Sequence, residues 1–233
     1  MAVTVYTWAG RWVPSPHGPR IIDRAESWRH AHGRARFLEL HMERFGPAPP
    51  GLWDEALSLL DAPADLFPRL ARAQGRFYLE VRPAPARRER TRLALVDAPD
   101  PRRSPTVKGP DLARLAAHRQ RHLPAGTDDV VLGTFAETTT GALVGWRGTT
   151  LVTPRALHLP STTQKAVVAR ARSLGHPVIE GELDPCEPLW FCNALHGISP
   201  VSTIVSAGDL LSTPRFGGEG EWVGWWADPM SRS

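Results

Sequence analysis

Residues 97–110 interrupt the chain with a stretch that is dense in proline, glycine and charge. The run APDPRRSPTVKGP occupies most of it. Proline fixes φ and removes a hydrogen-bond donor, so such a run favours an irregular connection between domains. We therefore expect a small N-terminal α+β domain over residues 1–100 and a larger C-terminal domain over residues 110–233. Residues 101–109 are the expected linker.

Composition restricts the class of protein. The 233 residues include 42% hydrophobic side chains, enough to bury a sizeable core. The net charge is only +4, so the pI of about 9.7 reflects many arginines rather than a concentrated basic surface. No apolar run approaches the roughly 18 residues of a membrane span, and the N-terminus lacks the features of a signal peptide. We expect a cytoplasmic protein with no nucleic-acid or membrane partner.

The first portion is expected to form an antiparallel sheet with short helices. Apolar residues with high strand propensity occupy residues 3–13 and 36–40, and the second run leads directly into the helix start LHMERF. Leucines at near-helical spacing over residues 51–73 predict short helices broken by prolines. The segments GRFYLEVRP and TRLALVDAP predict two strands separated by the charged turn ARRER.

The second portion alternates predicted helices and strands. Helices are expected near residues 111–122 and 162–174. Strands are expected at residues 129–132, 141–146 and 150–152 and in the segments VIEGEL, LWFCNAL and PVSTIV. The tail after Ser212 is expected to be irregular. Its tryptophans form an aromatic patch that either covers the core or contacts a second copy of the chain.

Lysine is rare in this chain. Of the 28 basic residues only Lys108 and Lys165 are lysines, and the rest are arginines. Arginine stays protonated, whereas a lysine amine can lose its proton and act as a nucleophile. Either lysine is therefore a candidate for chemistry that arginine cannot perform.

Three further groups of residues are open to two interpretations each. Ser161, Thr162 and Thr163 stand at the expected start of a helix, where they bind a phosphate or form an ordinary N-cap. Asn193 is either a ligand or the end of a strand. Glu137, beside three threonines, is either functional or a solvated turn residue.

The order and spacing of these motifs resemble the aminotransferase class IV family, the pyridoxal phosphate enzymes of fold type IV. The resemblance extends from about Trp8 to Val205. It implies a two-domain α/β (α+β) protein with the D-amino acid aminotransferase-like fold. It also implies that a cleft between the domains holds pyridoxal 5'-phosphate.

Matching motifs imply roles for three charged residues. VKGPDLARL matches the position of the lysine that forms a Schiff base with the cofactor, so Lys108 is the expected Schiff-base and catalytic residue. LHMERF is similar to the stretch that supplies a phosphate-binding arginine, here Arg44. Glu137, in FAETTTG, corresponds to the carboxylate that keeps the pyridine nitrogen protonated.

Two later motifs imply the rest of a phosphate site. LPSTTQKAVV resembles the Leu-Pro-Gly-Ile-Thr-Arg helix start, so Thr162 and Thr163 are expected phosphate ligands. CNALHGISPV adds Asn193 and Ala194. Lys165, on the same helix, has no role in the family pattern and is expected to be solvated.

The resemblance is weakest near the N-terminus, where DRAESWRHAHGR replaces an aromatic-Gly-Asp-Gly turn and only Glu26 and Ser27 match. Ser161, Gln164 and Ala142 also replace the usual Gly, Arg and Asn. Because the N-terminal region helps to recognise substrate in the family, the substrate stays open.

The candidates for substrate contact are two arginines and a histidine. Arg29 and Arg34 could bind a substrate carboxylate, and His196 could reach the substrate from beside the phosphate site. In a chain this rich in arginine, the interpretation of both as surface residues is favoured. His30 and His32 lack a third ligand at a suitable interval, so no metal is expected.

The expected reaction begins with removal of a proton from an amino-acid-like substrate. The CNAL run resembles 4-amino-4-deoxychorismate lyase, which implies release of pyruvate and 4-aminobenzoate. An aminotransferase of the branched-chain or D-amino acid type is the alternative. A catalytically degenerate binding module is a second alternative. The resemblance also implies a homodimer.

Overall fold

The computed structural model describes residues 3–61, 63–133 and 135–228 and divides the chain into two compact units. The first unit takes residues up to 86 together with residues 107–112. The second takes residues 87–106 and the chain from residue 113. This division differs from the expected boundary at residue 100, because the strand over residues 91–95 hydrogen-bonds to strands of the second unit.

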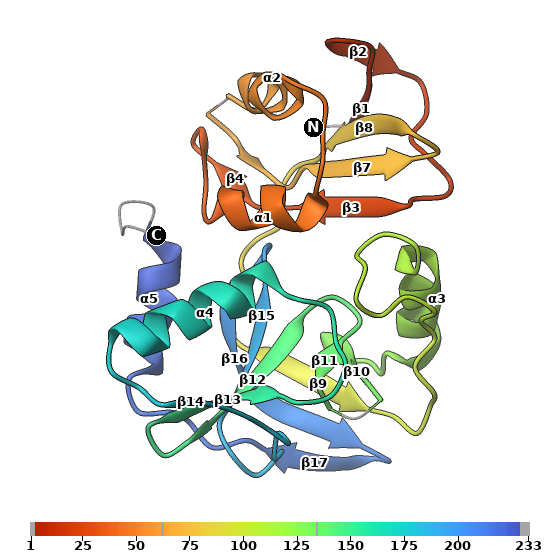
Figure 1. Cartoon of the computed structure of the whole chain (residues 1–233). Helices are drawn as coiled ribbons and strands as arrows, with labels where there is room; N and C mark the ends of the chain where they lie inside the picture. The colour runs from red at the N-terminus through yellow and green to blue at the C-terminus, as the bar shows by residue number, and fades with distance from the viewer. Residues whose placement is uncertain (1–2, 62, 134, 229–233) are drawn as a thin grey trace. The chain divides into compact units, whose positions relative to one another are not determined.

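The first unit is built on a five-stranded antiparallel sheet in the order β2-β1-β8-β7-β3. Helix α1 runs along β3 (Figure 1). The strands β4, β5 and β6 form a second, small sheet. The elements of this unit are β1 (Thr4–Trp8), β2 (Trp12–Ser15), β3 (Arg24–Ser27), β4 (His30–Ala31), β5 (Arg34–Ala35), α1 (Leu38–Phe45), α2 (Leu52–Leu59), β6 (Asp65–Leu66), β7 (Arg69–Ala73) and β8 (Arg76–Val81).

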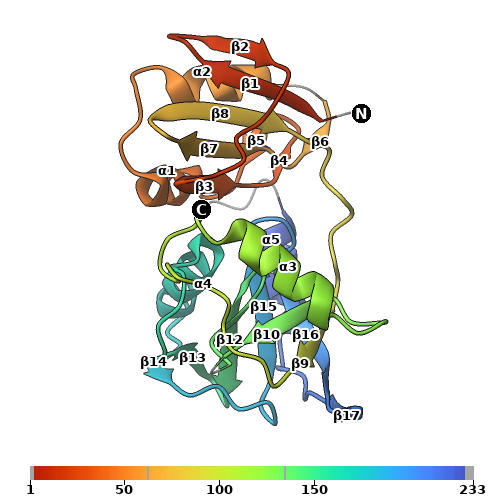
Figure 2. The same ribbon diagram turned by 90° about the vertical axis from the view of Figure 1, so that its right-hand side faces the viewer.

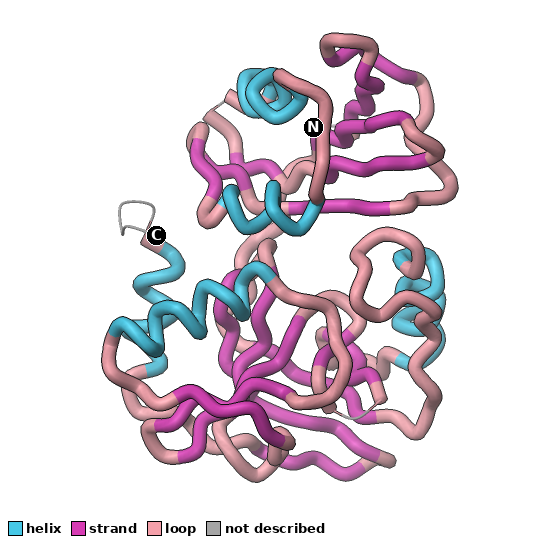
Figure 3. Tube along the Cα trace, viewed as in Figure 1, coloured by secondary structure: helices cyan, strands magenta, loops and turns pink. Residues whose placement is uncertain are grey.

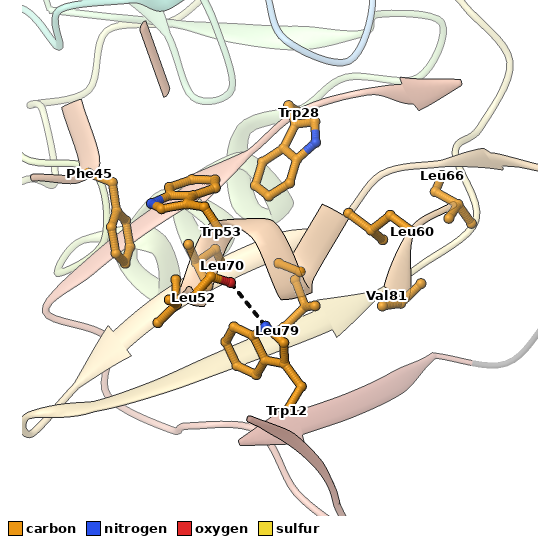
Figure 4. Close-up of a cluster of buried hydrophobic side chains, with 11 residues drawn as sticks. Trp12, Trp28, Phe45, Leu52, Trp53, Leu60, Leu66, Leu70, Leu79 and Val81 are labelled. Atoms are coloured by element: carbon orange, nitrogen blue, oxygen red, sulfur yellow. Dashed lines mark hydrogen bonds between the residues drawn. The ribbon is translucent and has the colours of Figure 1, made fainter. Parts of the chain in front are cut away.

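Alternation along β7 separates the two faces of this sheet. Leu70 joins a core cluster with residues of both helices, whereas the next residue, Ala71, packs with Ala25 on the opposite face. In the cluster, Trp12 Nε1 donates a hydrogen bond to the Leu52 carbonyl at 3.1 Å (Figure 4). This bond satisfies the buried indole of Trp12.

Two expectations for the first portion are corrected. The second half of residues 51–73 forms β6 and β7 rather than a helix, because its leucines are buried by strand pairing with β4 and β8. Residues 36–40 form a turn and the first residues of α1 rather than a strand. The antiparallel sheet itself is confirmed.

The second unit contains a nine-stranded sheet (Figure 2). Its path is β11-β10-β9-β16-β15-β12-β13-β14, with β17 paired to β16. Because β11 also pairs with β12, six of these strands close into a ring. The elements are β9 (Thr91–Leu95), α3 (Leu112–His122), β10 (Asp129–Leu132), β11 (Glu137–Thr138), β12 (Ala142–Arg147), β13 (Thr150–Pro154), α4 (Thr162–Ser173), β14 (Val178–Gly181), β15 (Leu189–Asn193), β16 (Gly197–Ser206), β17 (Asp209–Ser212) and α5 (Glu219–Ala227).

The last of these helices corrects the expectation of an irregular tail (Figure 3). Trp222, Trp225 and Trp226 recur at helical spacing in α5, and all three are buried. The Trp222 ring lies 5.5 Å from that of Trp146 in β12, centroid to centroid. The tryptophans therefore cover the core of their own unit.

Within the described residues, no helix combines the length and apolar character needed to cross a bilayer.

Candidate active site

Lys108 lies in the short segment that belongs to the first unit. Its carbonyl accepts a hydrogen bond of 2.8 Å from the backbone N–H of Ala25 in β3. The following residue, Gly109, has φ +143°, and a Cβ there would lie only 2.7 Å from the Cα of Arg24. Glycine is therefore required for this close approach, and the backbone fixes the place of Lys108 against β3.

A fully buried carboxylate, Glu26, lies in the same strand. Its Oε2 lies 2.7 Å from Nδ1 of His41, and its two oxygens accept hydrogen bonds of 2.6 and 2.7 Å from Nε and Nη2 of Arg44. Burial by itself raises the pKa of Glu26. The His41 hydrogen bond and the charges of Lys108 and Arg44 outweigh burial and lower it to about 2. Glu26 is therefore an anion at neutral pH.

The pKa of the Lys108 amine is also shifted. Burial lowers its pKa from 10.5 to about 8, the negative charge of Glu26 opposes this shift, and the charge of Arg44 adds to it. About a tenth of the amines are then neutral at pH 7, against well under a thousandth at the ordinary pKa. A neutral amine is the form that attacks a carbonyl carbon. The site thus contains a nucleophile.

Arg44 has a partner that the sequence did not predict. Its Nε and Nη2 form a two-pronged ion pair with Glu26. Arg24 also donates a 2.7 Å hydrogen bond to the Arg44 carbonyl and so ties α1 to β3. A phosphate at Arg44 would share the guanidinium with Glu26.

In the second unit, Glu137 is held in the short strand β11. Leu132 of β10 lies opposite it on one side and Ala142 of β12 on the other. Its Oε1 accepts hydrogen bonds of 2.5 Å from Arg102 Nη1 and 3.0 Å from the Leu159 N–H. Glu137 is buried rather than solvated.

The start of α4 shows the N-cap interpretation for its first hydroxyl residue, and the phosphate interpretation stays a prediction. Ser161 is the N-cap, and its Oγ accepts a 3.3 Å hydrogen bond from the Gln164 N–H. Thr162 and Thr163 are buried in the first helical turn. The Gln164 side chain donates to the Leu143 carbonyl at 3.1 Å, so this replacement of the family's arginine ties α4 to β12. Lys165 is exposed, as expected.

Asn193 shapes the turn after β15. Its Oδ1 accepts hydrogen bonds from the N–H groups of Leu195 at 3.1 Å and His196 at 2.7 Å. Its Nδ2 donates to the Thr140 carbonyl at 3.3 Å, which joins this turn to the loop after β11. The side chain therefore sets the path of the backbone through Ala194.

The residues suggested for substrate contact have different surroundings. The guanidinium of Arg29 forms an ion pair with Asp65 and also donates to the Pro85 carbonyl at 3.0 Å. Arg34 is exposed in β5. Nδ1 of His196 accepts a 3.1 Å hydrogen bond from the Arg88 N–H.

Sequence reasoning missed two charged residues that contact the expected site residues. Arg102 is one of many arginines and lies in the expected linker, where nothing distinguishes it from Arg103. Glu26 left a weak signal, since it is one of two residues that match the family in its region.

The geometry fits pyridoxal phosphate chemistry. Lys108 provides an amine of lowered pKa. Within the described part of the chain, both hydrogen bonds to the Glu137 carboxylate use Oε1, which leaves Oε2 to accept from a ring nitrogen. The first-turn residues of α4 suit a phosphate.

Comparisons with known proteins give the family of the chain. The model of the amino-transferase class IV family matches residues 58–204. No protein with a curated description matches the sequence.

Solved structures share the fold. A hypothetical aminotransferase from Mycobacterium tuberculosis in its PLP-bound form has 21% identity and a TM-score of 0.75, covering 96% of this chain and 98% of that one. A 4-amino-4-deoxychorismate lyase from Pseudomonas aeruginosa has 18% identity and a TM-score of 0.77, covering 99% and 100%. A fold IV transaminase from Curtobacterium pusillum has 17% identity and a TM-score of 0.75, covering 96% and 97%.

The fold and the family match define a pyridoxal-phosphate-dependent enzyme of fold type IV. The chain belongs to the aminotransferase class IV family.

Proposed function

We propose that this enzyme is a lyase of the aminodeoxychorismate lyase type, which releases pyruvate and 4-aminobenzoate. The observation that carries a catalytic assignment is the amine of Lys108, fixed against β3 with a pKa lowered to about 8. The preference for a lyase rests on the CNAL run, in which Asn193 organises the turn. An aminotransferase is the alternative.

The proposed cofactor ligands are the residues that match the motifs of the family. Lys108 forms the covalent link, and Oε2 of Glu137 accepts a hydrogen bond from the protonated pyridine nitrogen. The phosphate is held by Arg44 and by the N–H and hydroxyl groups of Thr162 and Thr163, together with Asn193 and Ala194. When bound, pyridoxal phosphate accepts the electron pair that a substrate carbon releases on losing its proton.

The proton transfer is assigned to Lys108. Once displaced by the substrate amine, Lys108 takes the proton from the carbon that carries this amine and can return it to the departing three-carbon group. Glu26 faces the resulting ammonium with a negative charge and stabilises it. The same first proton transfer serves an aminotransferase, so the later steps decide between the two activities.

The first experiment reduces the loaded protein with borohydride and maps the modified peptide by mass spectrometry. We expect a pyridoxyl group on Lys108 and none on Lys165. K108A should lose the label and at least about 1,000-fold in kcat, since it lacks both the covalent link and the base. K165A, which removes the other lysine, should keep both. A wild-type protein that binds no cofactor would support the binding module instead.

The second experiment separates the two activities. The enzyme is incubated with aminodeoxychorismate, and pyruvate and 4-aminobenzoate are measured. A parallel reaction contains an amino donor and 2-oxoglutarate, and glutamate is measured. Pyruvate release supports the lyase, whereas glutamate formation without pyruvate release overturns it.

The homodimer, which the family resemblance implies, and the cytoplasmic location, which was expected from the sequence, remain proposals. Sedimentation of the loaded enzyme would test the first, since a dimer has twice the 25.6 kDa mass of the chain.

A further inference from the structure

Arg102 links two carboxylates within the second unit. Its Nη1 donates to Glu137 Oε1 at 2.5 Å, while its Nε and Nη2 donate to the carboxylate of Asp100 at 2.9 and 2.6 Å. Nη1 also lies 3.5 Å from the Pro105 carbonyl. The Arg102 side chain is only 7% exposed, and that of Glu137 only 6%. These contacts bind the chain before Lys108 to the strand that carries Glu137.

The net charge of the triad formed by Asp100, Arg102 and Glu137 favours a cationic partner. With both carboxylates ionised, Asp100, Arg102 and Glu137 carry a net charge of −1. A protonated ring nitrogen at Glu137 would bring the total to zero, which favours binding in a buried place. Loss of the guanidinium would leave the buried Glu137 carboxylate without its cation, or would force Glu137 to take up a proton.

We propose that Arg102, itself held by Asp100, is a positioning residue that favours the ionised form of Glu137 and occupies its Oε1, so that Oε2 accepts a hydrogen bond from the protonated ring nitrogen of the cofactor. This inference rests on the role proposed above for Glu137. It assigns a function to an arginine outside the motifs of the family.

The electrostatics of the triad support this assignment. Burial raises the pKa of Glu137 above its ordinary value, and the charge and hydrogen bond of Arg102, followed by the Leu159 N–H and His158, reduce this rise without reversing it. Burial also favours the neutral form of Asp100, but the hydrogen bonds of Arg102 outweigh it, and His118 adds to them, so that the pKa of Asp100 is lowered. Removal of Arg102 would therefore favour a neutral Glu137, which cannot hold a ring nitrogen in its protonated form.

The guanidinium is chemically suited to this task. Its planar fork serves the Asp100 carboxylate with two donors while a third reaches Glu137. A lysine has one nitrogen and cannot span both carboxylates in the same geometry. R102K should therefore keep the charge but lose part of the positioning.

The test compares R102Q, R102K and R103Q with the wild type, each loaded with ¹⁵N-labelled pyridoxal phosphate. Arg103 is the matched control, since it is an adjacent arginine that is exposed. The ¹⁵N chemical shift gives the pH at which the ring nitrogen loses its proton. We expect this midpoint to fall by about one pH unit or more in R102Q, to fall less in R102K, and to stay unchanged in R103Q. In R102Q, kcat should fall at least about tenfold with little change in KM.

A second readout needs no cofactor. Without Arg102, the folded state should hold a proton on Glu137 that the unfolded chain has already released. Stability then falls as pH rises above the ordinary pKa of 4.5. The loss in melting temperature of apo R102Q relative to the wild type should therefore grow between pH 5 and pH 8. A purely structural role predicts a loss that does not change with pH.

The outcomes separate the two proposals. A wild type that carries no label on Lys108 overturns the proposed function, while the apo measurement still tests the coupling of Arg102 to Glu137. A labelled wild type in which R102Q matches R103Q in nitrogen midpoint and kcat overturns the role of Arg102. A loss in melting temperature of apo R102Q that is independent of pH also overturns it.

Discussion

At the residue scale, the site depends on how buried charges are paired. Glu26 is inaccessible to solvent and yet ionised, because His41 and Arg44 donate hydrogen bonds to it and Lys108 adds a nearby positive charge. The same carboxylate keeps the Lys108 amine from losing its proton even more readily. Glu26 thus limits the reactivity of the nucleophile.

We predict that E26Q lowers the pKa of Lys108 further. Glutamine removes the negative charge that favours the ammonium form, so more of the amine is neutral at a given pH. Reductive methylation of the apoprotein at a series of pH values, read by mass spectrometry at Lys108, measures this pKa. The midpoint should move from about 8 to a lower pH. E39Q, an exposed change on the neighbouring helix α1, should leave the midpoint unchanged, and an equal midpoint in E26Q would contradict the coupling.

Acid stability provides a separate test of Glu26. Its folded-state pKa of about 2 lies below the ordinary 4.5, so its ionised form stabilises the fold at pH values above 4.5. This contribution, about 3 kcal/mol from the size of the shift, is lost as the pH falls from 4.5 towards 2. Urea unfolding across this range should show the loss in the wild type. In E26Q the dependence on pH should be shallower, whereas E39Q should follow the wild type.

Sequence reasoning identified residues with a distinctive type or motif. Lys108 stands out because lysine is rare, and Glu137 because its neighbours match a pattern. Arg102 and the pairing of Arg44 with Glu26 could not be found in this way. They depend on which side chains the fold buries together, and any of the many arginines could have filled either place.

At the element scale, glycines permit two close approaches. Gly109 allows the Lys108 segment to approach β3, and Gly197 allows α5 to pack against the start of β16. Gly197 has φ +75°, and a Cβ there would lie 1.9 Å from Cδ1 of Trp226. Neither approach has a local sequence signal beyond the glycine itself, since the contacting residue is distant in the chain.

We predict that G197A strongly destabilises the protein, by about 3 kcal/mol or more. The left-handed backbone is strained for alanine, and the new methyl group overlaps an indole in a packed core. G148A is the matched control, because Gly148 has φ +61° with open space around it and should cost only about 1 kcal/mol. Denaturant unfolding measures both. Equal losses in the free energy of unfolding of the two variants would contradict the prediction, because the overlap with Trp226 would then not destabilise G197A.

Most elements of the second unit were predictable from hydrophobic period, including α3, α4 and the strands β10, β12 and β13. Two of the failures have different causes. Helix α5 was missed because its glycine-rich flank suggested a loop, although its tryptophans recur at helical spacing. In the first unit, β6 and β7 were taken for helix because Leu66 and Leu70 also fit a helical period, and only pairing with β4 and β8 settles the choice.

At the scale of the whole molecule, the chain passes between its two units more than once. Residues 87–106 belong to the second unit, residues 107–112 return to the first, and the chain then re-enters the second. Composition predicted a linker over residues 101–109 but could not show this return, because the return depends on a backbone hydrogen bond to Ala25 and on the sheet partners of β9.

We predict that cleavage of the backbone at one peptide bond between Asp97 and Pro99 leaves the two fragments associated. The N-terminal fragment would retain β9, which pairs with β10 and β16 of the other fragment. The Lys108 segment of the C-terminal fragment would stay bound to β3. An inserted protease site and size-exclusion chromatography test this. The cut protein should elute with the uncut one and separate only in urea, whereas separation in native buffer would contradict the prediction.

The return of residues 107–112 to the first unit also governs how this enzyme can be recombined with its relatives. In a chimera of two related enzymes joined at a single point in the linker, Lys108 and Gly109 would come from one enzyme. Strand β3, with Glu26, would come from the other. Gly109 and the strand that it approaches, β3, would then come from different enzymes, and their close contact could be lost. A functional chimera must therefore inherit residues 1–86 and 107–112 as one block, although a stretch of twenty residues separates them in the gene.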